Sequence, residues 1–189
     1  DAYDGTVNIY QWDTSDPVLK TWSKSYPGVV QPKSAISQNL MDHLRYPEDL
    51  FKVQRDVLSA YHVKSASAFY GGQDFWRVPR DPSTFGGNVA NQPPYFTTLQ
   101  LPGAANESFM LTTPFVPRGG RENLSAFAAV NASPGKDYGK ITVLQLPRST
   151  NIAGPTQVAS NFEAKPEVAT TLSLLRQGGS DVVLGNLLT

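Results

Sequence analysis

The sequence of 189 residues contains no cysteine and only two histidines, His43 and His62. The first absence excludes disulfides, thiolate metal sites and a cysteine nucleophile. The second leaves few nitrogen ligands, and no further ligand is spaced close to His62, so a closed transition-metal site is not indicated. We therefore expect neither a metal nor another cofactor.

Charge and long apolar runs are also scarce. Charged residues make up 17% of the chain, and 16 basic side chains balance 16 acidic ones. Binding to a phosphate backbone needs a basic excess or a basic stripe, so nucleic acid is not expected as a partner. The apolar stretches are all shorter than the roughly 18 residues of a membrane span, and none has the form of a signal peptide.

The best-specified element is a helix that begins at Pro47. A proline suits the first helical turn, and Glu48 and Asp49 then place negative charge where the helix dipole favours it. At about 100° per residue, one arc collects six apolar side chains, Leu50, Phe51, Val53, Val57, Leu58 and Tyr61. We expect this arc to be buried, and His62 at its edge to be a partly buried, hydrogen-bonded histidine.

Helices and strands fall into separate parts of the sequence. Helices are predicted from Pro17, over 35–44, from Pro47 and from Pro166. Strands are predicted over 6–12, 95–101, 109–115, 124–131, 140–146, 157–163 and 181–184. This segregation predicts the α+β class, an antiparallel sheet with several helices packed mainly on one face. The length suits a single domain over residues 1–189.

Two segments carry the candidate binding residues, and no residue is predicted to be catalytic. The candidates are Tyr70, Gln73, Asp74, Trp76, Arg77, Arg80, Asp81, Arg118 and Arg121. Aromatic rings beside arginines are typical of carbohydrate and protein recognition sites. The alternative for 70–82 is a structural corner in which Trp76 is buried and Asp74 or Asp81 holds Arg77 and Arg80. The alternatives for 118–121 are an anion-binding backbone nest and a hairpin turn.

One motif imitates a catalytic signature. Ser133 and Lys136 have the Ser-x-x-Lys spacing, which works when one helical turn brings the amine to the hydroxyl. Pro134 and Gly135 stand between them, so we expect a hairpin loop here.

Four stretches resemble one known family. RYPEDLFKVQRDVLSAYHV (45–63), FYGGQDFWRVPRDP (69–82), QPPYF (92–96) and FMLTTPFVPRGGRENLSAFAAVNASPG (109–135) are similar to Uncharacterised Protein Family 0182, and the likeness runs from about Tyr3 to Thr189. The resemblance implies a bacterial multi-pass membrane protein with a large extracytoplasmic region. Both ends of the chain interrupt patterns, so we expect a fragment excised from that region, placed at the cell membrane on its extracytoplasmic side.

The function expected on this basis is non-catalytic. The domain would serve envelope assembly or the recognition of a ligand or partner. The expected partners are the remainder of its own membrane-embedded chain and an envelope protein or polymer. The alternative is a hydrolase or transferase acting on cell-envelope polymers, since a pair of carboxylates can assemble from residues distant in the sequence.

Overall fold

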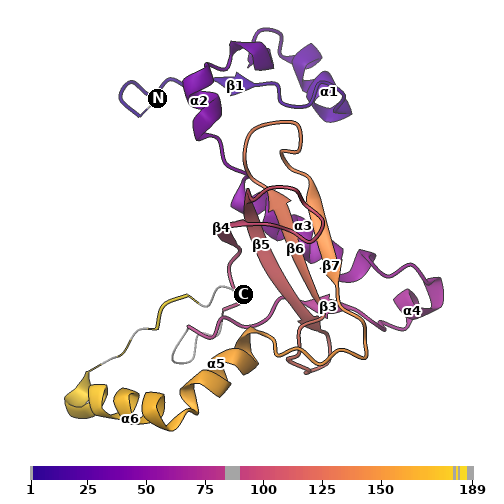
Figure 1. The fold of residues 1–189 in the computed structure, drawn as a ribbon. Coiled ribbons are helices and arrows are strands. Elements are labelled where there is room, and N and C mark those ends of the chain that lie inside the picture. The colour runs from indigo at the N-terminus through magenta and orange to yellow at the C-terminus, as the bar shows by residue number, and fades with distance from the viewer. Residues whose placement is uncertain (1, 84–89, 181, 183, 187–189) are drawn as a thin grey trace. The chain divides into compact units, whose positions relative to one another are not determined.

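The computed structural model describes residues 2–83, 90–180, 182 and 184–186, which group into two compact units, Asp1–Leu44 and Arg45–Thr189 (Figure 1). Helices and an antiparallel sheet are both present, which confirms the α+β class. The single domain over 1–189 stays a prediction. In the described part of the chain, no helix has both the length and the apolar content needed to cross a bilayer.

The first unit is built from short elements. They are β1 (Ile9–Tyr10), α1 (Pro17–Ser25), β2 (Val30–Gln31), a 3₁₀ turn (Lys33–Ala35) and α2 (Gln38–His43). The strands β1 and β2 pair in parallel. The Asp16 side chain caps α1 by accepting from the backbone N–H groups of Val18 and Leu19 at 2.7 and 3.0 Å. The helix predicted from Pro17 is thus confirmed.

The second unit contains the sheet. Its elements are α3 (Glu48–Tyr61), α4 (Ala66–Tyr70), β3 (Trp76–Arg77), β4 (Tyr95–Leu99), β5 (Ser108–Pro117), β6 (Ala126–Asn131), β7 (Ile141–Gln145), α5 (Pro155–Glu163), α6 (Pro166–Leu175) and a 3₁₀ turn (Gln177–Gly179). Strand β5 pairs with β6, and β6 pairs with β7. Both β3 and β4 pair with β5, β4 along its first half and β3 at its end. The four strands predicted between 95 and 146 are confirmed.

The strand predicted over 157–163 is wrong, because this segment is helix α5. Pro155 occupies the first helical turn, where its missing N–H costs nothing. The Gln157 side chain accepts from the backbone N–H of Gly154 at 3.3 Å, which satisfies a free donor at the helix start. These local signals outweigh the apolar alternation. The strand predicted over 181–184 includes residues outside those described.

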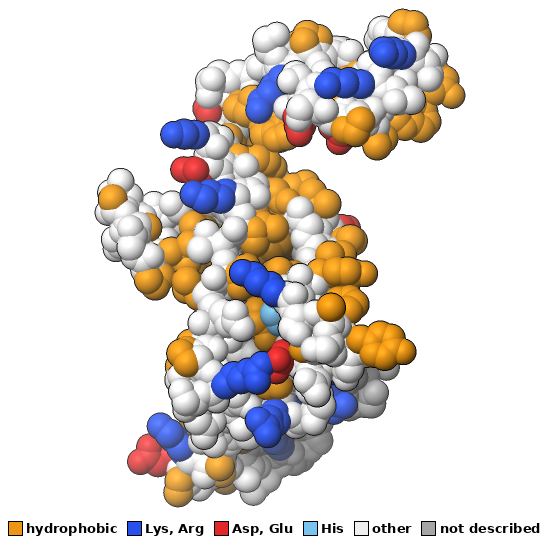
Figure 2. Space-filling model, turned by 90° about the vertical axis from the view of Figure 1, so that its right-hand side faces the viewer, with side chains coloured by type: hydrophobic (Ala, Val, Ile, Leu, Met, Phe, Trp, Pro, Cys, Tyr) orange, Lys and Arg blue, Asp and Glu red, His pale blue; other side chains and the backbone are white. Residues whose placement is uncertain are grey.

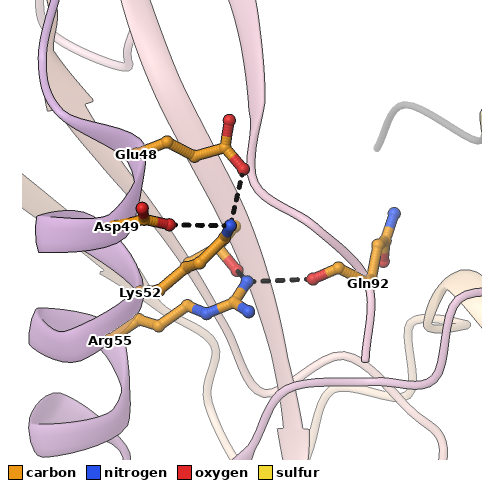
Figure 3. A network of polar contacts seen from close by, with 6 residues as sticks. Glu48, Asp49, Lys52, Arg55 and Gln92 are labelled. Atoms are coloured by element: carbon orange, nitrogen blue, oxygen red, sulfur yellow. Dashed lines mark hydrogen bonds and ion pairs between the residues drawn. The ribbon is translucent and has the colours of Figure 1, made fainter. Parts of the chain in front are cut away.

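The expected burial of the α3 arc is wrong for four of its six residues. Phe51 is 1% exposed and Leu58 packs beside it on the core, but Leu50, Val53, Val57 and Tyr61 are exposed. Arg55 takes their place against the sheet and is only 6% exposed. Its guanidinium donates to the Gln92 carbonyl at 2.9 Å (Figure 3). It also donates to Thr113 Oγ1 at 3.3 Å. These bonds to buried acceptors make burial of a charged side chain tolerable, and a hydrophobic pattern does not show them.

Trp76 belongs to the same core as Phe51. Its ring lies 5.4 Å from that of Phe115, and it is 7% exposed. The rest of this cluster consists of Tyr46 and aliphatic side chains, which come mainly from β5 and β6. The burial expected of Trp76 in a structural corner is therefore confirmed.

Phe51 and Leu50 provide a matched test of how α3 faces the sheet. Phe51→Ala should lower the free energy of unfolding by about 3–5 kcal/mol, because a buried ring is lost. Leu50→Ala changes the neighbouring residue, which is 47% exposed, and should cost about 0.5 kcal/mol. Urea denaturation of both variants measures the difference. A larger loss for Leu50→Ala would show that the helix faces the sheet with its other side.

Trp76 and Tyr70 provide a second pair from one segment. Trp76→Ala should destabilise the protein by about 3–5 kcal/mol. Tyr70→Ala should change the stability by no more than about 0.5 kcal/mol, because Tyr70 is 96% exposed. Thermal unfolding followed by circular dichroism distinguishes them. Equal melting temperatures for the two variants would place Trp76 on the surface.

Candidate functional site

A cleft of about 600 Å³ lies beside β3, between the end of α3, α4 and the loops that follow β5 and β7. We call it the cationic cleft. Four basic side chains line it, Lys64, Arg118, Arg121 and Arg148, together with His62, Asp74, Phe75 and Trp76. Figure 2 looks onto the side of the molecule on which α4 lies, where basic side chains (blue) stand among hydrophobic ones (orange).

The pairing of β3 with β5 brings the two candidate segments together. Trp76 lies opposite Pro117, and the Arg118 N–H donates to the Phe75 carbonyl at 2.7 Å. The Arg118 guanidinium lies 5.6 Å from the centre of the Phe75 ring, close enough for a cation–π contact. Segments 70–82 and 118–121, which the sequence presents separately, therefore form one wall.

Residues 118–121 begin the connection, residues 118–125, between the antiparallel strands β5 and β6, as the hairpin interpretation predicts. Gly119 and Gly120 have φ values of 105° and 91°, a backbone conformation that residues with a Cβ rarely adopt. Both arginines line the cationic cleft.

The His62 ring lies between two backbone carbonyl oxygens, and a neutral imidazole donates to one of them. Nδ1 lies 2.8 Å from the Leu58 carbonyl oxygen, and Nε2 lies 3.0 Å from that of Asp74. The ring also stacks on Trp76, with centroids 3.3 Å apart and planes 12° apart. This confirms the partly buried, hydrogen-bonded histidine that the sequence predicts. Because carbonyl oxygens occupy both nitrogens, His62 is not placed to take a proton from a substrate.

Basic side chains outnumber acidic ones in the lining of the cationic cleft. Four basic side chains face one carboxylate, Asp74, which forms an ion pair with Arg148. Leaving His62 out of the sum, the four basic side chains and the one carboxylate give the lining a net charge of +3. A concave surface with walls of lower dielectric concentrates such a field and attracts anions.

A second cleft, of about 620 Å³, shares Trp76 and Arg118 with the first. Here Arg77 forms an ion pair with Glu122, and its guanidinium also donates to the Arg121 carbonyl at 3.4 Å. The pairing predicted for Arg77 with Asp74 or Asp81 is therefore wrong. The reason is the sheet: β3 carries Arg77 along β5 toward the loop that contains Glu122.

Arg80 and Asp81 also differ from the predicted corner. Asp81 accepts from the backbone N–H of Ser83 at 2.9 Å and from its hydroxyl at 2.7 Å, as in a turn. Arg80 is exposed on the second cleft and makes no ion pair with Asp74 or Asp81. The local sequence does not show whether Asp81 accepts hydrogen bonds from Ser83 or pairs with an arginine.

The cationic cleft thus contains four of the nine candidates, Asp74, Trp76, Arg118 and Arg121. Arg77 and Arg80 line the second cleft, whereas Tyr70, Gln73 and Asp81 line neither. Sequence reasoning missed Lys64 and Arg148. Arg148 follows β7, and only the strand order carries it to Asp74, so no short motif could have found it.

The acidic side chains and histidines decide whether a metal site or a catalytic carboxylate pair is present. Over the described ranges, no three side chains of His, Asp or Glu gather as a metal site would require. The need for no metal stays a prediction. Two carboxylates, Asp56 and Glu122, line the second cleft, but Arg77 holds Glu122 and Asp56 is exposed.

Comparison with known proteins finds one family. The profile of the Uncharacterised protein family (UPF0182) matches residues 1–175. The UPF0182 protein of Thermobifida fusca is 54% identical over the whole of this chain, which covers 18% of that protein. The UPF0182 proteins of Streptomyces coelicolor and Bifidobacterium longum are 53% and 45% identical over the whole chain, which covers 19% of each. No solved structure matches.

The resemblance seen in the sequence is therefore confirmed. The chain spans about a fifth of the length of the relatives it matches. The match covers residues 1–175 of 189 and includes both clefts. This chain belongs to the Uncharacterised Protein Family 0182.

Proposed function

We propose that this chain is a non-catalytic recognition domain that binds an anionic group in the cationic cleft. The observation that carries the proposal is the charge of the lining, four basic side chains against one carboxylate that is already paired. Hydrogen bonds between arginine and an anion are shorter and stronger than neutral ones, and the planar guanidinium suits phosphate and carboxylate.

Arg118 and Arg121 in the cationic cleft are available for hydrogen bonds to an anion. Arg118 and Arg121 are exposed and form none of the ion pairs found among the described residues. Arg118 is positioned by Phe75 and by its own backbone bond to that residue. A partly preorganised cation loses less entropy on binding than a free one.

The proposed setting is the extracytoplasmic side of a bacterial membrane, where the domain would form part of a multi-pass protein. This setting rests on the family resemblance. In that environment the anionic group would belong to an envelope polymer or an envelope protein. Phosphate and carboxylate are the two chemistries that such a ligand would present.

Catalysis on envelope polymers is the second candidate, and Asp56 and Glu122 in the second cleft are the residues that favour it. Glycoside hydrolysis needs one carboxyl group that keeps its proton and one that does not. Glu122 is held in an ion pair by Arg77, and Asp56 is exposed. The second cleft therefore does not present two unengaged carboxyl groups, and recognition fits the geometry better.

Replacing the two arginines tests the proposal. Arg118→Gln with Arg121→Gln should weaken binding of linear polyphosphate or of polygalacturonate by at least about tenfold, which equals about 1.4 kcal/mol. Both side chains are exposed, so the fold should be retained. Isothermal calorimetry at two salt concentrations measures affinity, and the two polymers distinguish phosphate from carboxylate.

Lys140→Gln is the matched control. Its side chain is 69% exposed and does not line the cationic cleft. It should bind both polymers as the unchanged protein does. The proposal fails if the unchanged protein binds neither polymer, or if Lys140→Gln weakens binding as much as the double arginine variant does.

A further inference from the structure

The outward face of α3 is apolar over three turns. Leu50, Val53, Val57 and Tyr61 are 47, 61, 52 and 72% exposed. Their spacing of three, four and four residues places them on one side of the helix. From Leu50 to Tyr61 the stripe spans 11 residue-to-residue steps, or roughly 16 Å along the axis. We call these four side chains the α3 stripe.

Aromatic contacts continue the α3 stripe onto α4. The Tyr61 ring lies 5.3 Å from that of Phe69, and Phe69 lies 5.3 Å from Phe75. Single exposed apolar residues are ordinary on a protein surface, but a contiguous apolar patch marks an interaction site. On this helix the usual burial of apolar and charged side chains is reversed, because Arg55 is buried and two valines are exposed.

Acidic residues run along one edge of the α3 stripe. Asp49 and Asp56 are seven positions apart, so they lie on the same side of the helix, two turns from one another. Both are exposed. Asp49 also contacts Lys52 at 3.1 Å, whereas Asp56 makes no ion pair among the described residues. A complementary surface would therefore be apolar, with a basic edge.

The relatives contain ample polypeptide to supply that surface. This chain covers 18 to 20% of their length, so about four-fifths of each relative lies outside the matched region. A straight stripe with helical spacing packs best against a second helix, whose side chains fit between its i and i+4 rows. A segment of the same polypeptide binds at high effective concentration and needs only modest affinity.

We propose that the α3 stripe is the docking surface for an amphipathic helix from the part of the family polypeptide outside these 189 residues. This helix would place apolar side chains on Val53 and Val57 and a lysine or arginine opposite Asp56. The proposal is independent of anion binding in the cationic cleft, because none of the four side chains of the α3 stripe lines that cleft.

Cysteine labelling tests the proposal cleanly, since this chain has no cysteine of its own. Val53→Cys and Val57→Cys are introduced singly, both in the 189-residue chain and in the full-length family polypeptide that carries it, with any other cysteine there replaced by serine. Asn106→Cys, an exposed position between β4 and β5, is the control. The rate of modification by N-ethylmaleimide is measured in each protein.

We expect the two valine positions to react at least tenfold more slowly in the full-length polypeptide than in the 189-residue chain, with the control unchanged. Equal rates in the two proteins would overturn the proposal. Protection already present in the 189-residue chain would assign the stripe to residues 1–44 or a second copy, and protection caused by phosphatidylglycerol vesicles would assign it to a bilayer. Either result would also overturn it.

Discussion

The buried guanidinium of Arg55 sets the orientation of α3, and the surfaces of the second unit follow from that orientation. Arg55 joins the helix to the Gln92 carbonyl and to Thr113 on β5. Desolvation lowers its pKa below the ordinary value, while the charges of Asp56 and Glu48 oppose this, and an arginine remains charged at neutral pH. A charge buried in this way is costly if the helix turns, because the bonds to Gln92 and Thr113 are lost.

Strand β5 links that constraint to the candidate site. Thr113, in the buried centre of this strand, accepts a hydrogen bond from Arg55, and the end of the strand pairs with β3. That pairing buries Trp76, brings Phe75 to Arg118 and stacks His62, at the end of α3, on the indole. The cationic cleft and the α3 stripe are therefore two results of one arrangement. One collects basic side chains from three loops, and the other displays apolar side chains that the sheet leaves uncovered.

Local signals in the sequence predict much of this fold. Asp16 and Pro17 specify the start of α1, and the alternation between 95 and 146 predicts four antiparallel strands. The apolar arc of α3 predicts its helix but not its orientation, because hydrophobicity does not count the bonds that bury Arg55. The ion pairs of Arg77 with Glu122 and of Asp74 with Arg148 span 45 and 74 positions, so they depend on strand order. The sequence presents the binding candidates in two separate segments, and only the pairing of β3 with β5 joins them.

The most direct test compares Arg55→Ala with Val57→Ala on the same helix. The account predicts that Arg55→Ala lowers the free energy of unfolding by about 1–3 kcal/mol, because Gln92 and Thr113 lose a buried donor. It predicts a change within about 0.5 kcal/mol for Val57→Ala, since Val57 is 52% exposed. Guanidinium denaturation of the 189-residue chain gives both values. A large loss for Val57→Ala beside a negligible one for Arg55→Ala would mean that α3 buries its apolar arc, and would contradict the account.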